Sequence, residues 1–249
     1  MKRLIKKLFD SVGVEIRLKR NVTAVREKEK REEVLRQWAL LHRYQPQTIL
    51  DIGANEGQSA ALFRQLFPGV AIYSFEPLAD CHQQVAHFLE SHGPGTAFHC
   101  ALGESNRQTT IHRNEFTPSS SLLPMNTLHK TEFPKTTRSR PEQVDVKRLD
   151  DIAETQQWAD PLVIKVDVQG FEEPVIRGGL DTFTRARAVV IELTSYPLYE
   201  SQSTFERVQQ QLQSIGFVFR GVIDQMRSPQ DGRILQFDAL FENDSPGPS

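Results

Sequence analysis

The 249 residues include 38% hydrophobic and 25% charged side chains, enough to bury one sizeable core in a single α/β domain. The formal net charge of -2 excludes a global positive field, so nucleic acid is not expected as a partner. Two cysteines are too few for a disulfide-stapled secreted scaffold, and we expect Cys81 and Cys100 to be small buried side chains in a reducing compartment.

The first 20 residues predict a short basic amphipathic helix. Leu4, Leu8 and Val12 fall on one helical stripe, and Lys6 and Lys7 lie largely off it. Such a helix either docks on its own domain, which its short length favours, or makes peripheral contact with an anionic membrane surface. No apolar run approaches the roughly 18 residues that span a bilayer, and no secretory signal is recognisable. We therefore expect a cytoplasmic protein.

Helical and strand-like patterns alternate along the rest of the chain. A helix is expected over 26–44, where apolar residues recur at helical spacing until Pro46. The expected strands are 48–52, 70–75, 96–100, 143–148, 161–168 and 188–193, followed by a final pair at 217–223 and 233–242. The expected intervening helices are 58–67, 78–91, 150–158, 171–180 and 203–215. This alternation predicts a doubly wound, mostly parallel sheet with helices on both faces.

The pattern indicates three regions: a helical extension at 1–45, a catalytic domain at 46–242 and a frayed tail at 243–249. Within the domain, the polar and proline-punctuated stretch 102–141 breaks the alternation. It contains one probable extra strand, TTIHR. We expect its part from 113 to 141 to form a mobile cover over an acceptor pocket, because it is too long for a simple connection. Association into a homo-oligomer is left open.

A glycine loop, DIGANEG, follows the first buried strand and opens a helix, so it occupies the ligand-binding turn of a doubly wound sheet. A dinucleotide fingerprint in this register requires glycine at positions 51, 53 and 56. The chain instead has Asp51, Gly53 and Glu56. Because two carboxylates would repel a pyrophosphate, the loop disfavours a nucleotide-dependent oxidoreductase.

The same carboxylates suit S-adenosylmethionine, which carries a sulfonium, an ammonium group and no phosphate. Asp51 can hold the ammonium group, directly or through water, and Gly53 and Gly57 permit close backbone approach. Glu76 ends the next strand, where a carboxylate can accept hydrogen bonds from both ribose hydroxyls. The alternative is structural: Asp51 caps a helix and Glu76 is a solvated strand end. Together the two positions favour an adenosyl cofactor.

Four motifs carry a family resemblance: DIGANEG, SFEP at 74–77, SSSL at 119–122 and IKVDVQGFE at 164–172. The chain resembles the FkbM-type methyltransferases over roughly 48–193. The resemblance implies the α/β class I methyltransferase (Rossmann-like) fold, with a mostly parallel seven-stranded sheet of order 3-2-1-4-5-7-6 and an antiparallel last strand. It also implies O-methylation of a hydroxyl on a sugar, glycan or other small-molecule natural product.

The resemblance also implies which residues contact S-adenosylmethionine. By position these are Asp51, Gly53, Asn55 and Gly57 in the methionine-side loop, Glu76 at the ribose, and Ala101 with Leu102 beside the adenine. Members of the family often have glutamate where this chain has Gln169. If that residue were the base, this chain would lack it, which directs attention to Asp167.

Transfer to a hydroxyl benefits from a base that accepts the departing proton. Asp167 ends the fourth strand and is the first candidate, with Glu192 at the end of the fifth as the second. Lys165 lies on the same strand face as Asp167 and is a third catalytic candidate or its ion-pair partner. Structurally, Asp167 could instead cap the helix that begins near Phe171.

Two further possibilities concern a bound metal ion and a non-catalytic role. The histidines show no metal-binding spacing, so no metal ligand is assigned. A Mg²⁺ ion on Asp167 and a neighbouring carboxylate is kept as an alternative, because such an ion acidifies a hydroxyl. A non-catalytic adenosyl-binding module would need no acceptor pocket, and Asp167 with the long serine-rich segment argues against it.

Overall fold

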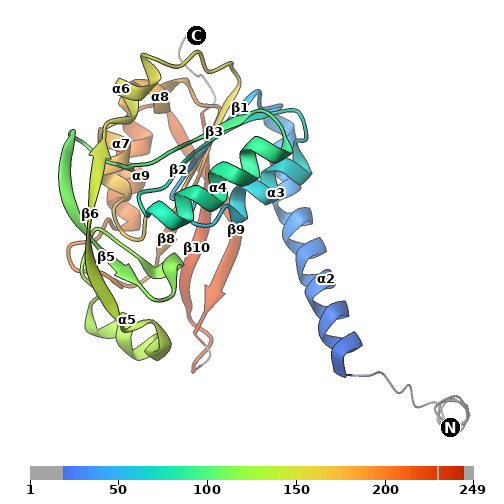
Figure 1. Cartoon of the computed structure of the whole chain (residues 1–249), viewed down its shortest axis with the longest axis vertical. Coiled ribbons are helices and arrows are strands. Elements are labelled where there is room, and N and C mark those ends of the chain that lie inside the picture. The colour runs from blue at the N-terminus through green and yellow to red at the C-terminus, as the bar shows by residue number, and fades with distance from the viewer. Residues whose placement is uncertain (1–18, 229, 244–249) are drawn as a thin grey trace, which may run out of the picture. The chain divides into compact units, whose positions relative to one another are not determined.

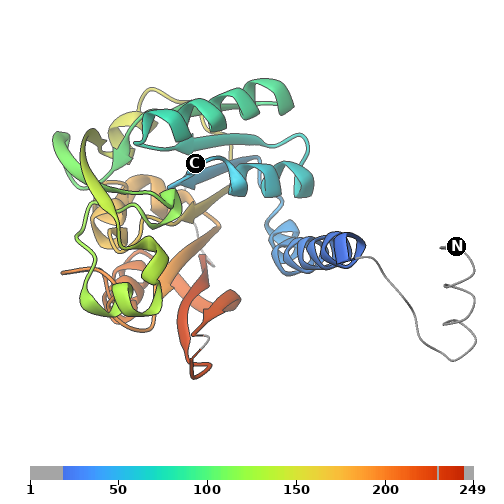
Figure 2. The same cartoon turned by 60° about the horizontal axis from the view of Figure 1, so that its bottom comes forward.

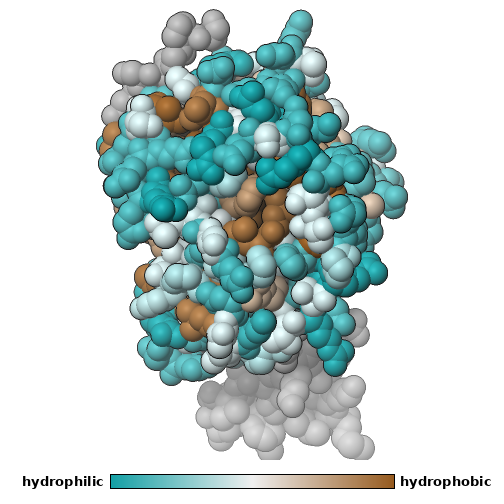
Figure 3. Space-filling model, turned by 90° about the vertical axis from the view of Figure 1, so that its left-hand side faces the viewer, coloured by the Kyte–Doolittle hydropathy of each residue, from teal (hydrophilic) through white to brown (hydrophobic). Residues whose placement is uncertain are grey.

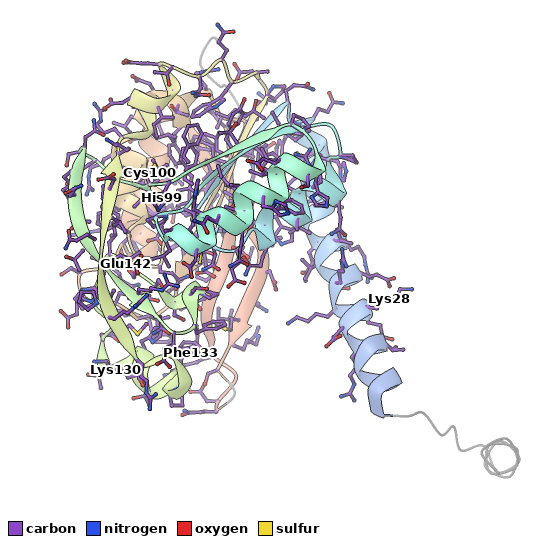
Figure 4. The ribbon with its side chains drawn as sticks, in the orientation of Figure 1. Lys28, His99, Cys100, Lys130, Phe133 and Glu142 are labelled. Atoms are coloured by element: carbon purple, nitrogen blue, oxygen red, sulfur yellow. The ribbon has the colours of Figure 1, made fainter. Side chains whose placement is uncertain are left out.

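The computed structural model describes residues 19–228 and 230–243, and the chain divides into two units, 1–40 and 41–249. The division falls inside the 3₁₀ helix η1 (Ala39–Tyr44), earlier than the expected boundary after residue 45. In the first unit, α2 (Lys19–Trp38) is a charged helix on which Figure 4 labels Lys28. The predicted amphipathic helix lies outside the described residues up to residue 18. None of the described helices combines the length and apolar character needed to cross a membrane.

A seven-stranded sheet forms the centre of the second unit (Figure 1). Its order is β3-β2-β1-β7-β8-β10-β9, with parallel neighbours from β3 to β8 and β10 antiparallel to both β8 and β9. The strands are β1 (Thr48–Ile52), β2 (Ala71–Phe75), β3 (Gly95–Phe98), β7 (Leu162–Val166), β8 (Ala188–Thr194), β9 (Phe217–Arg227) and β10 (Ile234–Asn243). Renumbered within this sheet, the order is 3-2-1-4-5-7-6, which confirms the class I methyltransferase fold.

Helices cover both faces of this sheet (Figures 1 and 2). On one face lie α3 (Gln58–Leu66) and α4 (Ala79–His92), and on the other lie α7 (Glu172–Arg177), α8 (Leu180–Arg185) and α9 (Phe205–Ser214). Because the sheet is covered on both sides, every residue of β1 and β7 is buried. These two central strands therefore read as apolar runs apart from Thr48, Asp51 and Lys165. Asp51 and Lys165 are paired neighbours in the register.

The predicted helix over 171–180 ends at Arg177 as α7, and the separate helix α8 begins only at Leu180. A Cβ atom at Gly178, between them, would lie 1.9 Å from the carbonyl oxygen of Gly103, so the chain passes too close to another backbone for any side chain. The predicted helix over 150–158 is also shorter and forms α6 (Leu149–Ala153). Both differences come from turns that the apolar spacing does not reveal.

A three-stranded sheet contains much of the stretch that was expected to be a loop. Its order is β4-β6-β5, formed by β4 (Ala101–Leu102), β5 (Arg107–Asn114) and β6 (Ser139–Lys147). Between β5 and β6 lie η2 (Thr117–Ser119), α5 (Thr127–Glu132) and η3 (Pro134–Thr136). Figure 4 labels His99 and Cys100 between β3 and β4, and Glu142 on β6. The extra strand is confirmed within β5, but the predicted strand over 96–100 ends at Phe98.

Asn243 belongs to β10, although it was expected to begin the tail. It is buried, its N–H donates to the carbonyl oxygen of Arg187, and its Nδ2 donates to that of Thr184. The rest of the predicted tail lies outside the described residues.

Both cysteines are buried free thiols, as predicted. Burial raises the pKa of Cys81 and of Cys100 to about 12. The thiols therefore stay protonated near neutral pH and act as packing groups.

Candidate active site

The glycine loop joins β1 to α3 and touches the end of β7. Gly53 has a φ of +81°, and a Cβ atom there would lie 1.8 Å from the carbonyl oxygen of Asp167. Gly57 has a φ of +91°, is the N-cap of α3 and packs against Val85. Glycine is therefore required at position 53 for two reasons, the left-handed backbone and the direct contact between two chain segments.

Glu76 fixes the glycine loop from the end of β2. Its Oε2 accepts a hydrogen bond from the Asn55 N–H at 2.8 Å, and its Oε1 accepts one from the Leu78 N–H at 2.8 Å. Only 4% of the residue is exposed, and this burial raises the pKa of Glu76 to about 7. Each carboxylate oxygen keeps a second lone pair. Glu76 can therefore hold the loop and still accept hydrogen bonds from a ligand.

A cavity of about 290 Å³ opens where β1, β2 and β7 end. Seven of the predicted site residues line it: Gly53, Asn55, Glu76, Ala101, Leu102, Lys165 and Asp167. Much of the remaining wall is apolar, with Phe75, Leu78 and Phe171 among the lining residues. Figure 3 shows hydrophobic side chains gathered near the middle of an otherwise mostly hydrophilic face. An apolar wall with a few convergent carboxylates is typical of a small-molecule site and fits a cationic adenosyl ligand.

Three predicted residues, Asp51, Gly57 and Glu192, are not among the residues that line this cavity. Asp51 is fully buried, and its Oδ2 accepts a hydrogen bond from the Ser74 hydroxyl at 3.3 Å. Its Oδ1 has no hydrogen-bond partner among the described residues. Burial raises the pKa of Asp51. With no exposed surface, Asp51 meets neither the cavity nor solvent in this conformation, and its predicted contact with an ammonium group stays a prediction.

Lys165 pairs with Asp167, as the strand spacing predicted. Its Nζ lies 3.2 Å from Asp167 Oδ2 and 3.9 Å from Asp51 Oδ1. Burial lowers the pKa of Lys165, but the two carboxylates raise it more, and the pKa ends above its usual value. Lys165 therefore stays charged and lies between one carboxylate in the cavity wall and one behind it.

Gln169 connects Asp167 to Glu192, which the sequence analysis did not anticipate. Its Nε2 donates hydrogen bonds to Asp167 Oδ1 at 2.8 Å and to Glu192 Oε2 at 2.6 Å. Its Oε1 accepts a hydrogen bond from the Tyr199 hydroxyl at 2.9 Å. Tyr199 has no motif of its own, so no sequence signal placed it here. The proximity of Gln169 to Asp167 in the chain was the available signal for the first of these contacts.

Glu192 lies on β8, which pairs with β10. Its Oε2 also accepts a hydrogen bond from Gln236 at 3.0 Å, and its partner in the register is Asp238. Burial, followed by the negative charges of Asp167 and Asp238, raises the pKa of Glu192 well above its usual value. Glu192 therefore tends to be protonated. A protonated carboxyl group cannot accept the proton of the acceptor hydroxyl, so Glu192 is less suited than Asp167 to act as the base.

The arrangement around Asp167 does not fit Mg²⁺. Both carboxylate oxygens face nitrogen donors, Lys165 Nζ on one side and Gln169 Nε2 on the other. Mg²⁺ prefers oxygen ligands in near-octahedral geometry. In the part of the chain that the structure describes, no three His, Cys, Asp or Glu side chains are grouped to hold a metal ion.

Asp167 does not cap a helix. The N-cap of α7 is Phe171, which makes no side-chain capping bond, and the Glu173 N–H in the first turn donates to Ser203 Oγ at 2.9 Å. The hydrogen bonds of the Asp167 carboxylate go instead to Lys165 and Gln169. The structural alternative left open by the sequence therefore does not explain this carboxylate.

The SSSL motif forms part of the cavity wall. Ser120, Ser121 and Leu122 line the cavity together with Thr117 from η2. The Thr117 hydroxyl donates to Asn55 Oδ1 at 3.1 Å, and the Ser121 hydroxyl donates to the carbonyl oxygen of Gln169 at 2.7 Å. The segment 117–122 is therefore tied both to the glycine loop and to the turn after β7.

Comparisons with known proteins agree with this geometry. The Methyltransferase FkbM domain matches residues 51–219. A similar protein, 2-O-methyltransferase NoeI from Sinorhizobium fredii (strain NBRC 101917 / NGR234), is 29% identical over 218 residues, covering 83% of this chain and 88% of the relative.

Solved structures overlap only loosely. The plantazolicin methyltransferase BpumL in complex with SAH has a TM-score of 0.47 at 12% identity, covering 90% of each chain. A putative RNA methyltransferase, PH1948 from Pyrococcus horikoshii, has a TM-score of 0.46 at 12% identity, covering 86% of this chain and 83% of the other. Overlaps this low do not bear on the acceptor. The matched FkbM domain, in contrast, spans more than half of the chain, from the glycine loop past the Asp167 motif, and this chain belongs to the FkbM methyltransferase family as an S-adenosylmethionine-dependent methyltransferase.

Proposed function

We propose that this enzyme methylates a hydroxyl oxygen of a sugar, glycan or other small-molecule natural product, and that Asp167 accepts the hydroxyl proton. The observation that carries the proposal is the carboxylate of Asp167 in the cavity wall at the end of β7. Glu76 lies at the end of β2, two strand spacings or about 10 Å across the sheet. The two carboxylates can therefore serve different parts of the reaction.

The cofactor contacts follow from the other lining residues. When bound, S-adenosylmethionine supplies a methyl group on a positively charged sulfur. Glu76 would accept hydrogen bonds from the ribose hydroxyls, and Ala101 with Leu102 would form the apolar wall beside the adenine. Gly53 and Asn55 would bring the loop backbone close to the methionine end.

Asp167 is suited to accept a proton where it stands. Its side chain is 30% exposed, whereas Asp51 behind it has no exposed surface. Lys165 and Gln169 each occupy one lone pair, and each oxygen keeps another for the acceptor hydroxyl. The Lys165 ammonium group compensates the negative charge of Asp167 before the carboxylate accepts the proton.

The acceptor class is supported by the relative and by the cavity wall. NoeI is named as a 2-O-methyltransferase, which supports oxygen as the methylated atom. The hydroxyls of Thr117, Ser120 and Ser121 belong to residues that line the cavity. Hydroxyl groups can both donate to and accept from the hydroxyls of a sugar.

The test is methyl transfer from isotopically labelled S-adenosylmethionine to a panel of acceptors. The panel contains free sugars, oligosaccharides and phenolic hydroxyls, together with thiol and carboxylate acceptors of similar size. We expect label on a hydroxyl oxygen, located by mass spectrometry and NMR, and strongest for a saccharide. Label only on sulfur or carboxylate acceptors would contradict the proposal.

Replacing Glu76 with Ala should weaken the binding of S-adenosylmethionine by about 1–3 kcal/mol, the usual cost of losing charge-assisted hydrogen bonds. The variant also loses the hydrogen bond from Asn55 in the glycine loop and the one from Leu78 after β2, so circular dichroism should first show that it is folded. Calorimetry then measures the affinity. A folded Glu76→Ala variant with unchanged affinity would remove Glu76 from the ribose site.

Cofactor affinity should rise as the pH rises through 7. Burial raises the pKa of Glu76 to about 7, so the free enzyme holds a proton there below that pH. The ionised carboxylate is the better acceptor for ribose hydroxyls, and binding should therefore release a proton. Calorimetry at pH 7 in two buffers of different ionisation enthalpy measures this release. Glu76→Gln keeps the size but cannot ionise, and equal proton release in both proteins would argue against the assignment.

The segment 117–122 should become more ordered when ligands bind. It contacts the glycine loop through Thr117 and the turn after β7 through Ser121, so any ligand that orders these loops also orders the segment. Hydrogen exchange should show added protection over 117–122 with cofactor and acceptor present. Equal protection with and without ligands would indicate a static insert instead of a cover.

A further inference from the structure

Three of the four hydrogen-bonding positions of the Gln169 amide are used. Its NH₂ group donates one hydrogen bond to Asp167 and one to Glu192, and its oxygen accepts from Tyr199. The opposite orientation would aim the amide oxygen at the Asp167 carboxylate, which offers no proton when ionised, and would lose the hydrogen bond to Asp167. The chemistry of its neighbours therefore fixes which way the amide points.

The backbone holds this side chain in an unusual turn. Gln169 has a φ of +53° and Gly170 a φ of +99°, so two successive residues with positive φ lie in the turn after β7. A non-glycine residue with positive φ is uncommon and carries strain. Two hydrogen bonds hold the turn. The Ser121 hydroxyl donates to the carbonyl oxygen of Gln169, and the Gly170 N–H donates to Glu172 Oε1. The strained turn directs the amide back toward the end of the strand.

Several charged and titratable groups face Asp167 from the elements packed around it. They are Asp51 on β1, Lys165 on β7, Glu172 on α7, Glu192 on β8, Tyr199 in the loop after β8 and Asp238 on β10. Lys165 is the only cation in this set, and four of the others are carboxyl groups. A neutral group that donates two hydrogen bonds separates Asp167 from Glu192 without adding charge.

From this geometry we propose that Gln169 is a positioning residue, which orients the Asp167 carboxylate toward the cavity and links it to Glu192. The inference rests on the proposed role of Asp167 as the base. Glutamate at position 169 would place a third carboxyl group against these two and remove the donors. Gln169 is instead a neutral group between the two carboxyl groups and donates one hydrogen bond to each of them.

The experiment compares Gln169→Leu, Gln169→Glu and the control Gln236→Leu. Gln236 also donates to Glu192 Oε2, but no hydrogen bond joins it to Asp167 among the described residues. Side-chain carboxyl NMR signals are assigned first, without substrate. Gln169→Leu should move the signals of both Asp167 and Glu192, whereas Gln236→Leu should move mainly that of Glu192. Thermal unfolding checks that each variant is folded.

Kinetics then separates positioning from a purely structural role. Gln169→Leu should lower kcat by about 10- to 100-fold, the scale expected for a misplaced catalytic group, with the KM for S-adenosylmethionine within threefold. Gln169→Glu should move the acidic limb of the pH–rate profile to higher pH and regain activity there. A uniform loss at every pH, with an unmoved limb, would overturn the proposal.

The two proposals fail in different ways. An unmoved Asp167 signal in folded Gln169→Leu overturns the positioning role, whatever the activity. Shifted signals together with a wild-type enzyme that labels no hydroxyl acceptor overturn the proposed function, while the link between Gln169 and the two carboxyl groups stands.

Discussion

Replacing Asp167 with Asn is expected to lower methyl transfer by about 100-fold or more, the scale on which general bases contribute, while cofactor affinity stays within a few-fold of wild type. Asn has nearly the same size, but its neutral amide cannot accept the proton that leaves the acceptor hydroxyl. The Lys165 ammonium group, 3.2 Å away in the wild type, loses its closer carboxylate partner but keeps Asp51. The fold should therefore survive, and kcat should carry the loss.

Asp181→Asn is the matched control, because it makes the same chemical change at an exposed position on α8. We expect it to retain wild-type turnover.

EDTA should leave the wild-type enzyme unaffected, because the nitrogen donors around Asp167 do not fit Mg²⁺. Loss of activity in EDTA with rescue by Mg²⁺ would instead assign Asp167 to a metal site, and near wild-type turnover of Asp167→Asn would remove it from both roles.

Gly53→Ala is expected to have the second large effect. The added methyl group would lie 1.8 Å from the carbonyl oxygen of Asp167, and alanine would have to adopt a φ of +81°. Backbone strain and forced separation of the two loops together should lower the free energy of unfolding by about 2–4 kcal/mol. Separating the loops also displaces Asp167, so cofactor binding and turnover should fall together.

Gly69→Ala provides the comparison, since a Cβ atom at Gly69 would meet nothing within 4 Å and its φ is not positive. That substitution should change the free energy of unfolding by less than about 0.5 kcal/mol. Chemical denaturation of both variants measures the difference. Equal stabilities would mean that the contact between the glycine loop and the Asp167 turn is not tight in solution.

The centre of the main sheet was predictable because β1 and β7 are buried on both faces. Such strands appear as continuous apolar runs, and the alternation with helices orders them along the chain. The predictions were wrong where a backbone contact decides the structure, as at Gly178, or where a very short strand pairs away from the main sheet, as in β4. Neither kind of contact leaves a periodic pattern of apolar residues in the sequence.

The candidate site was predictable where its residues end strands. Glu76 and Asp167 come directly after buried strands, and parallel strands bring their carboxyl ends to one edge of the sheet. The contacts of Gln169 with Glu192 and Tyr199 were not predictable, because they depend on a left-handed turn and on a loop far along the chain. Burial of Asp51 behind Lys165 was hidden for a similar reason, since spacing alone does not tell which carboxylate faces the cavity.

Calorimetry with S-adenosylmethionine, S-adenosylhomocysteine, NAD and ATP tests the central claim most directly. The carboxylates around the glycine loop suit a cationic adenosyl ligand and repel a pyrophosphate, and Glu76 is placed to hold a ribose. We predict saturable binding of S-adenosylmethionine and S-adenosylhomocysteine at concentrations where NAD and ATP give no measurable heat of binding. Tight binding of NAD, with none for the two adenosyl ligands, would contradict the account.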